Sequence, residues 1–323
     1  MKDLSKDAVN ELTVDEAGQG QRIDNFLMRV LKGVPKSHIY RILRSGEVRV
    51  NRKRARPDVR LAVGDLLRIP PIRTGTQSDV RERLARPASF PILYEDDAII
   101  AVDKPAGLAV HGGSGIAFGL IEQLRASRPN AKFLELVHRL DRDTSGVLLI
   151  AKQRASLVAL HKALREGRVD KRYLVLVKGK WRDAKRQVEL PLTKFVTSDG
   201  ERRVRVERDG GKTARTVFYL REVRAGSEPT MTLLEAELHT GRTHQIRVHL
   251  THLGFPLAGD DKYGDFSWNK TLARQGLKRM FLHAWKLAVA HPTEARELVL
   301  EAPLPDDLQS FLARVDAPQR AIA

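Results

Sequence analysis

Positive charge is concentrated in one short segment near the start of this chain, and this divides the sequence into two parts. Residues 20–90 contain 17 Lys and Arg against 6 Asp and Glu, whereas residues 1–19 contain 2 against 5. The remaining residues 91–323 contain 38 against 29, so under a quarter of the chain carries most of the net charge of +17. Such an excess favours a polyanionic partner, nucleic acid first and an anionic membrane second. We therefore expect a small binding module followed by a larger domain.

The composition argues against several classes of protein. A hydrophobic share of 42% in 323 residues is enough for a packed core, and a typical domain of about 150 residues predicts two domains. The apolar runs are far shorter than the roughly 18 residues of a membrane span, and the acidic start of the chain is unlike a signal peptide. The absence of cysteine removes disulfides and thiolate metal sites, which fits a reducing compartment.

Apolar residues recur at helical spacing twice within the basic segment. The spacing predicts helices over residues 21–30 and 38–44, followed by short strands over 47–51 and 64–69. This order of elements, with the string QRIDNFL…VPKSHIYRILRSGEVRVN, resembles the S4 RNA-binding domain. A small αβ domain with an incidental basic face is the alternative. The cations predicted to bind RNA lie on or beside the second helix and the hairpin: Lys36, Arg41, Arg44, Arg49, Arg52, Lys53 and Arg54.

Two consecutive prolines close this module, and a polar, Arg-rich stretch without periodicity follows. We therefore divide the chain into an N-terminal extension (1–19), an S4 module (20–71), a linker (72–89) and a second domain (90–323). In the second domain strands outnumber helices, and the continuous apolar run Gly146–Ala151 predicts a strand buried on both faces. Hairpin-like neighbours are frequent, so we predict an α+β fold with a mixed, largely antiparallel sheet flanked by helices.

Two features invite a ligand site without matching an established motif. The glycine-rich loop His111–Gly115 lacks the GxxxxGK[ST] and GxGxxG spacings, which leaves contact with RNA phosphate or an ordinary loop. His244, His249 and His252 lie in one predicted helix, residues 243–253, but on different sides of it and without an HExxH pattern. We therefore expect no metal site.

The same predicted helix has two neighbouring faces. Apolar residues recur at i, i+4 and i+7 from Ile246, while His244 and Arg247 share an adjoining polar face. The helix is therefore expected to pack on the core and to present His244 and Arg247 beside it.

The most informative stretch is Val137–Lys152, VHRLDRDTSGVLLIAK, in which Asp141 stands in a turn just before the predicted buried strand. An aspartate at such a position is normally a turn or cap residue. The whole string, however, resembles the signature of the RluA-type pseudouridine synthases. Further stretches agree with that family in order: KPAGLAVHGGSG, DKRYLVLVKG, LHTGRTHQIRVHLTHLGFPLAGDDKYGD and RMFLHAWKL. The resemblance extends from residue 20 through the rest of the chain.

The resemblance implies an active site. It makes Asp141 the catalytic carboxylate, Tyr173 the residue that stacks on the target base and helps to remove its C5 proton, and Arg247 the cation that favours ionised Asp141. Tyr173 as an ordinary strand residue and Arg247 as a phosphate clamp are the alternatives. The residues implied to contact the substrate are Arg139, which would fill the space of the flipped base, and Leu282, His244 and Ile246.

The resemblance also implies a function. The expected reaction is the isomerisation of specific uridines in 23S ribosomal RNA, which needs no redox change or group donor and hence no cofactor. The implied partner is 23S rRNA or a large-subunit precursor particle, and we expect a cytoplasmic monomer without a membrane partner. The alternatives are the same chemistry at other rRNA uridines, or a non-catalytic RNA-binding protein of ribosome assembly.

Overall fold

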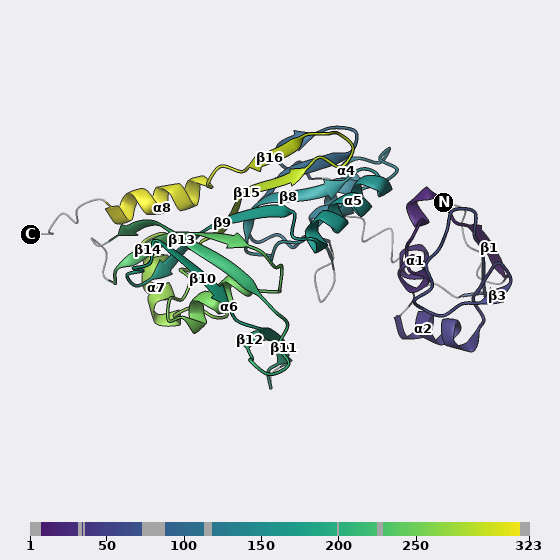
Figure 1. Ribbon diagram of the computed structural model, residues 1–323, viewed down its shortest axis with the longest axis horizontal. Helices are drawn as coiled ribbons and strands as arrows, with labels where there is room; N and C mark the ends of the chain where they lie inside the picture. The colour runs from purple at the N-terminus through teal and green to yellow at the C-terminus, as the bar shows by residue number, and fades with distance from the viewer. Residues whose placement is uncertain are drawn as a thin grey trace, which may run out of the picture. The chain divides into compact units, whose positions relative to one another are not determined.

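The computed structural model describes residues 8–31, 34, 36–72, 88–112, 118–198, 200–224 and 229–316 (Figure 1). The chain divides into two compact units, Met1–Ala85 and Arg86–Ala323, which we call the N-terminal unit and the C-terminal unit. Each unit has its own hydrophobic core. Most of the expected linker, and residues 113–115 of the glycine-rich loop, lie outside the described residues.

The N-terminal unit packs two helices against an antiparallel sheet with the strand order β1-β4-β2-β3. Both predicted helices are confirmed, because apolar side chains such as Phe26 and Ile42 are buried in one core. The second helix begins at Lys36, earlier than predicted. The elements are β1 (Asn10–Thr13), α1 (Ile23–Val30), α2 (Lys36–Ser45), β2 (Arg49–Val50), β3 (Lys53–Arg54) and β4 (Leu66–Ile69).

Residues 10–14 belong to the fold of the N-terminal unit rather than to a separate extension, and this corrects the expected division. Strand β1 pairs with β4 from Asn10 opposite Ile69 to Thr13 opposite Leu66. Val14, directly after the strand, is buried in the core of the N-terminal unit. The net negative charge of this stretch obscured a short alternation of polar and apolar residues, which is the pattern of a half-buried strand.

The C-terminal unit is built on one long sheet with the strand order β10-β13-β14-β9-β15-β8-β6-β5, to which β16 and β7 add at β15 and β8. Among the described strands, β15 and β8 form the parallel pair and the other pairs are antiparallel. The predicted α+β fold with a mixed, largely antiparallel sheet is therefore confirmed. The first strands and helices are β5 (Ile92–Glu95), β6 (Ile99–Lys104), α4 (Leu120–Ser127), β7 (Glu135–Leu136), β8 (Ser145–Ala151), α5 (Arg154–Arg165), β9 (Val169–Lys178) and β10 (Lys185–Glu189).

The remaining elements include a hairpin and two helices that the sequence analysis did not anticipate. Figure 1 shows the hairpin β11–β12 projecting from this unit near helix α6. These elements are β11 (Leu192–Val196), β12 (Arg202–Val206), β13 (Arg215–Arg224), β14 (Met231–Leu238), α6 (Gln245–His252), α7 (Phe266–Arg274), β15 (Leu282–Ala290), β16 (Glu297–Glu301) and α8 (Asp306–Asp316). No helix in the described ranges is long and apolar enough to cross a membrane.

Strand β8 lies between two layers of the core, which explains its continuous apolar sequence. Val147 and Leu149 pack with Leu157 and Leu160 of helix α5. Leu148 and Ile150 point to the opposite face of the sheet and belong to the core cluster that contains helix α4. Both faces of the strand are thus covered, as predicted from the run of residues 146–151. The turn that carries Asp141 is joined directly to this rigid central strand.

Candidate active site

A cleft of about 800 Å³ opens in the C-terminal unit where the turn before β8 meets strand β9 and the start of helix α6. Its walls come from segments more than 140 residues apart, from Val137 to Leu282. The structure brings all the site residues implied for this unit to that one cleft: Arg139, Asp141, Tyr173, His244, Ile246, Arg247 and Leu282. The cleft is therefore the candidate active site.

A buried lysine holds the turn that carries Asp141 through hydrogen bonds to backbone oxygens. Lys104 Nζ donates to the backbone oxygens of Pro105 at 2.8 Å, Leu108 at 2.7 Å and Arg142 at 3.0 Å. Burial lowers the pKa of the Lys104 ammonium to about 7. Since Arg142 follows Asp141 directly, this lysine fixes the backbone on one side of the carboxylate. Lys104 belongs to the KPAG stretch of the family resemblance, but its sequence context predicted no role for it.

A second set of contacts fixes the other end of this turn. Arg279 donates to Ser145 Oγ at 2.6 Å, and Ser145 Oγ lies 2.9 Å from His283 Nδ1. His283 Nε2 is 3.1 Å from the backbone oxygen of Ala302, and burial lowers the pKa of this imidazole to about 4. Gly146 has φ +111°, and a Cβ there would lie 2.2 Å from a backbone oxygen of β15. The parallel β8–β15 pairing thus begins in a close approach that favours glycine.

Arg247 contacts Asp141, but its strongest partner is a different carboxylate. Arg247 Nη1 lies 3.5 Å from Asp141 Oδ2. Its Nε and Nη2 donate to the two oxygens of Asp260 at 2.7 and 2.6 Å. Arg247 is only 3% exposed, so this member of the expected polar face is buried. Asp260 was not among the predicted site residues, although a buried arginine requires such a partner.

The Arg247–Asp260 pair stays charged despite its burial. Burial acts to lower the pKa of the Arg247 guanidinium, but the hydrogen bonds to Asp260 raise it above its usual value. Burial likewise acts to raise the pKa of Asp260, and the hydrogen bonds from Arg247 lower it below its usual range. Asp260 Oδ1 also accepts the backbone N–H groups of Lys262 and Tyr263 at 2.8 and 3.0 Å. A fixed positive charge therefore stands beside Asp141.

His244 is the second polar group near Asp141. It precedes helix α6 in the left-handed region, with φ +55°. Its Nε2 lies 3.7 Å from Asp141 Oδ2, and its Nδ1 lies 2.8 Å from Tyr263 Oη. Burial lowers the pKa of His244, which favours the neutral imidazole. His244 is thus placed at the cleft by a local backbone turn rather than by a helical face.

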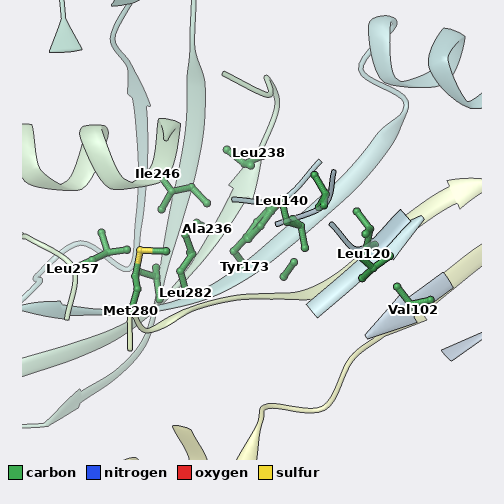
Figure 2. Close-up of a cluster of buried hydrophobic side chains, with 14 of the residues drawn as sticks. Val102, Leu120, Leu140, Tyr173, Ala236, Leu238, Ile246, Leu257, Met280 and Leu282 are labelled. Carbon is green, nitrogen blue, oxygen red and sulfur yellow. The ribbon is translucent and has the colours of Figure 1, made fainter. Parts of the chain in front are cut away.

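The apolar wall of the cleft includes Tyr173, Ile246 and Leu282, all of which are buried (Figure 2). Tyr173 stands on strand β9 opposite Ala284 of β15, two residues beyond Leu282. Burial raises the pKa of the Tyr173 phenol, and the nearby charge of Asp141 raises it further. Arg139, in contrast, is exposed at the edge of the cleft.

The cations predicted to bind RNA belong to the N-terminal unit and do not line this cleft. Arg41, Arg44 and the cations around the β2–β3 hairpin are exposed, while the side chain of Lys36 lies outside the described residues. Arg54 donates to the backbone oxygen of Arg44, which joins the hairpin to the end of helix α2. The exposed members of this set are Arg41, Arg44, Arg49, Arg52, Lys53 and Arg54.

One cluster in the described residues has the arrangement of metal ligands, and it lies outside the cleft: Asp96, His291 and Glu294. Asp96 already accepts hydrogen bonds from Tyr94 Oη and from two backbone N–H groups, and it lies 2.7 Å from His291 Nε2. These contacts close the turn between β5 and β6 and account for the cluster.

Comparison with known proteins identifies the class of this site. Residues 98–252 match the model of the RNA pseudouridylate synthase family, and residues 21–67 match that of the S4 domain. The chain belongs to the RNA pseudouridine synthases, which are isomerases, and it carries an S4 RNA-binding domain.

Individual relatives make the similarity more specific. The chain is 51% identical over 310 residues to the ribosomal large subunit pseudouridine synthase C of Escherichia coli strain K12, covering 94% of this chain and 95% of the relative. It is 48% identical over 313 residues to the protein of the same name from Haemophilus ducreyi, covering 96% of each. Among solved structures, human RNA pseudouridylate synthase domain containing 1 is 25% identical, with a TM-score of 0.55 over 72% of this chain and 98% of the human chain.

Proposed function

We propose that this enzyme isomerises specific uridines of 23S ribosomal RNA to pseudouridine, with Asp141 as its catalytic carboxylate and without a cofactor. The names of the bacterial relatives support the ribosomal target. The observation that carries the proposal is the position of Asp141 in the cleft, 3.5 Å from a buried arginine and beside an apolar wall.

The proposed reaction needs only a carboxylate and a fixed environment. The N1–C1′ bond of uridine breaks, the uracil turns, and C5 joins C1′, while a proton is lost from C5 and one is gained at N1. Substrate and product are isomers, so no electron or group donor is required. Asp141 would attack C1′, add to C6 or remove the 2′ proton, and each role requires an ionised carboxylate. The Arg247 guanidinium lies 3.5 Å from this carboxylate.

Tyr173 is proposed to stack on the uracil rather than to act as a base. Its raised pKa keeps the phenol protonated near neutral pH, which disfavours a phenolate that removes the C5 proton. Its ring stands in the same wall as Leu282 and Ile246 (Figure 2), and an apolar wall of this kind suits the faces of a flat base.

The target base must leave its stack to reach this cleft. Unstacking costs a few kcal/mol, and contacts between phosphates and the exposed cations of the N-terminal unit would offset that cost. We propose that Arg139, exposed at the cleft edge, fills the space vacated by the base. The partner would be 23S rRNA or a precursor particle, and the enzyme would act as a cytoplasmic monomer.

The experiment that tests the proposal maps pseudouridines in 23S rRNA. The map is compared between the parent strain, a strain lacking the gene, and strains complemented with wild type, Asp141→Asn or Asp143→Asn. Asp143 is the matched control, because it belongs to the same turn but pairs with Arg142 outside the cleft.

We expect specific 23S positions to lose pseudouridine on deletion and to regain it with wild type and Asp143→Asn, but not with Asp141→Asn. A pseudouridine map of 23S rRNA that is the same with and without the gene would refute the ribosomal target. Restoration by a homogeneous Asp141→Asn protein, free of deamidated aspartate, would refute the role of Asp141. Assays on naked rRNA and on isolated precursor particles then decide the form of the substrate.

A further inference from the structure

A tyrosine hydroxyl joins the projecting hairpin to the imidazole that faces Asp141. The backbone N–H of Val204, on strand β12, donates to Tyr263 Oη at 2.9 Å. The same oxygen lies 2.8 Å from His244 Nδ1. Within the described ranges these are the two polar partners of the hydroxyl, so a single oxygen bridges the hairpin and the cleft.

The positions of the protons follow from these two contacts. Because the Val204 N–H can only donate, Tyr263 Oη is its acceptor, and the phenol proton is directed to the remaining partner, His244 Nδ1. Burial raises the pKa of Tyr263 and lowers that of His244, so both groups are neutral near pH 7. The single imidazole proton is then on Nε2, the nitrogen that lies 3.7 Å from Asp141 Oδ2.

Tyr263 itself is rigidly held by the groups around it. Its backbone N–H donates to Asp260 Oδ1 at 3.0 Å, and its backbone oxygen accepts from Thr251 Oγ1 at 2.9 Å. Its ring lies 5.1 Å from the Arg247 guanidinium and packs edge-on against His244 with centroids 5.4 Å apart. The loop from Asp260 to Tyr263 therefore orders both polar neighbours of Asp141, one through a carboxylate and one through a phenol.

We propose that Tyr263 is a positioning residue that holds His244 as the Nε2–H tautomer facing Asp141 and ties this imidazole to the hairpin β11–β12. The Nε2–H then serves as a neutral donor toward the carboxylate or the substrate held beside it. This inference rests on the role of Asp141 proposed above for its catalytic consequence, but its structural part, the tautomer of His244, is independent of turnover.

The first test measures the tautomer directly by NMR of the full-length protein with 15N-labelled histidine. The His244 signals are assigned by their loss in His244→Gln. In wild type we expect a pyrrole-type Nε2 that carries the proton and a pyridine-type Nδ1 that accepts a hydrogen bond. In Tyr263→Phe we expect both signals to move toward a mixture of tautomers. Unchanged signals in Tyr263→Phe would overturn the proposal.

The second test measures the single-turnover rate at saturating RNA. We expect Tyr263→Phe to lower this rate about tenfold, equivalent to about 1.4 kcal/mol in the barrier, with the RNA dissociation constant changed less than twofold. If Tyr263 acts through His244, the double variant with His244→Gln will be no slower than His244→Gln alone. Tyr94→Phe is the matched control, because its hydroxyl bonds Asp96 outside the cleft.

Additive rate losses in the double variant would show that Tyr263 acts otherwise and would overturn the catalytic part of the inference. An equal rate loss in Tyr94→Phe would mean that removing a tyrosine hydroxyl outside the cleft lowers the rate as well. That result would also overturn the catalytic part of the inference. Lack of turnover by wild type would instead count against the proposed function and leave the NMR result unaffected.

Discussion

Arginines in the two units of this protein stand in opposite environments. Arg41 of the N-terminal unit is more than half exposed, and its ion pair with Glu47 spans 3.4 Å. Arg247 of the C-terminal unit is 3% exposed and donates two short hydrogen bonds to Asp260. An exposed pair contributes between zero and about 1 kcal/mol, so Arg41 is free to exchange its partner for a phosphate. Arg247 is not.

We expect this difference to separate RNA binding, in the N-terminal unit, from chemistry, in the C-terminal unit. A buried charge that loses its partner is strongly destabilising, so Arg247 and Asp260 must act as one unit that holds a fixed field beside Asp141. The exposed cations of the N-terminal unit are expected to attract RNA phosphates in a way that does not depend on exact geometry and that weakens with salt. The following predictions test this division, starting with the variant for which we expect the largest effect.

The largest effect is expected when the buried pair is broken. Asp260→Asn leaves the Arg247 charge uncompensated and should lower the free energy of unfolding of the C-terminal unit by about 3–5 kcal/mol. Urea titration followed by tryptophan fluorescence measures this unit alone, because Trp181, Trp268 and Trp285 all belong to it. Glu207→Gln in the solvent-exposed Arg205–Glu207 pair of the same unit is the control and should change little. Equally small losses of unfolding free energy in both variants would show that the buried and the exposed ion pairs do not differ in their contribution to stability.

Removal of the N-terminal unit should produce the next largest effect, on affinity. A protein lacking residues 1–85 should bind a large rRNA fragment about a hundredfold more weakly, equivalent to about 2.7 kcal/mol. The slope of log affinity against log salt should flatten by about 0.7–0.9 for each lost phosphate contact. Activity on a short hairpin at high enzyme concentration should remain, since the cleft belongs to the other unit. An unchanged slope would show that the N-terminal unit does not contact the RNA backbone.

Acid should weaken the C-terminal unit through its buried histidines. The pKa of His283 is about 4 in the folded protein, against an ordinary value of 6.5. Between these values the unfolded chain binds more protons than the folded one, so stability is lost as the pH falls from about 6.5 to 4. His283→Gln should make this loss shallower. His138, with a pKa of about 4, keeps part of it. Parallel stability curves for wild type and His283→Gln would contradict the assignment.

The smallest effect is expected for one exposed cation. Arg41→Gln should reduce the salt slope by the same 0.7–0.9 of a single phosphate contact and should change stability by less than about 0.5 kcal/mol. RNA binding measured at several salt concentrations gives the first value, and thermal unfolding gives the second. A change in the catalytic rate at saturating RNA would mean that Arg41 affects chemistry as well as binding. That result would contradict the proposed division between the two units.

The site was only partly predictable from the sequence. Asp141, Tyr173 and Arg247 belong to contiguous motifs, so each could be identified from its neighbours in the chain. Asp260 and Tyr263 stand in the quoted GDDKYGD stretch, but their contacts are with residues on helix α6 and on the hairpin. The unassigned Lys104 acts on a carbonyl 38 positions away. Periodicity reports burial and local structure, and it contains no information on which buried polar groups will meet.

The sequence alone determined the class of the chain: a basic module with its helices, a central strand covered on both faces, and the motifs of a pseudouridine synthase. These depend on local spacing and composition, which the linear chain records. Only the tertiary structure decided that the N-terminal stretch completes a sheet, that Arg247 is buried against Asp260, and that His244 is joined to the hairpin through Tyr263. Those contacts arise because desolvated charges and hydroxyls must find partners wherever the folded backbone places them.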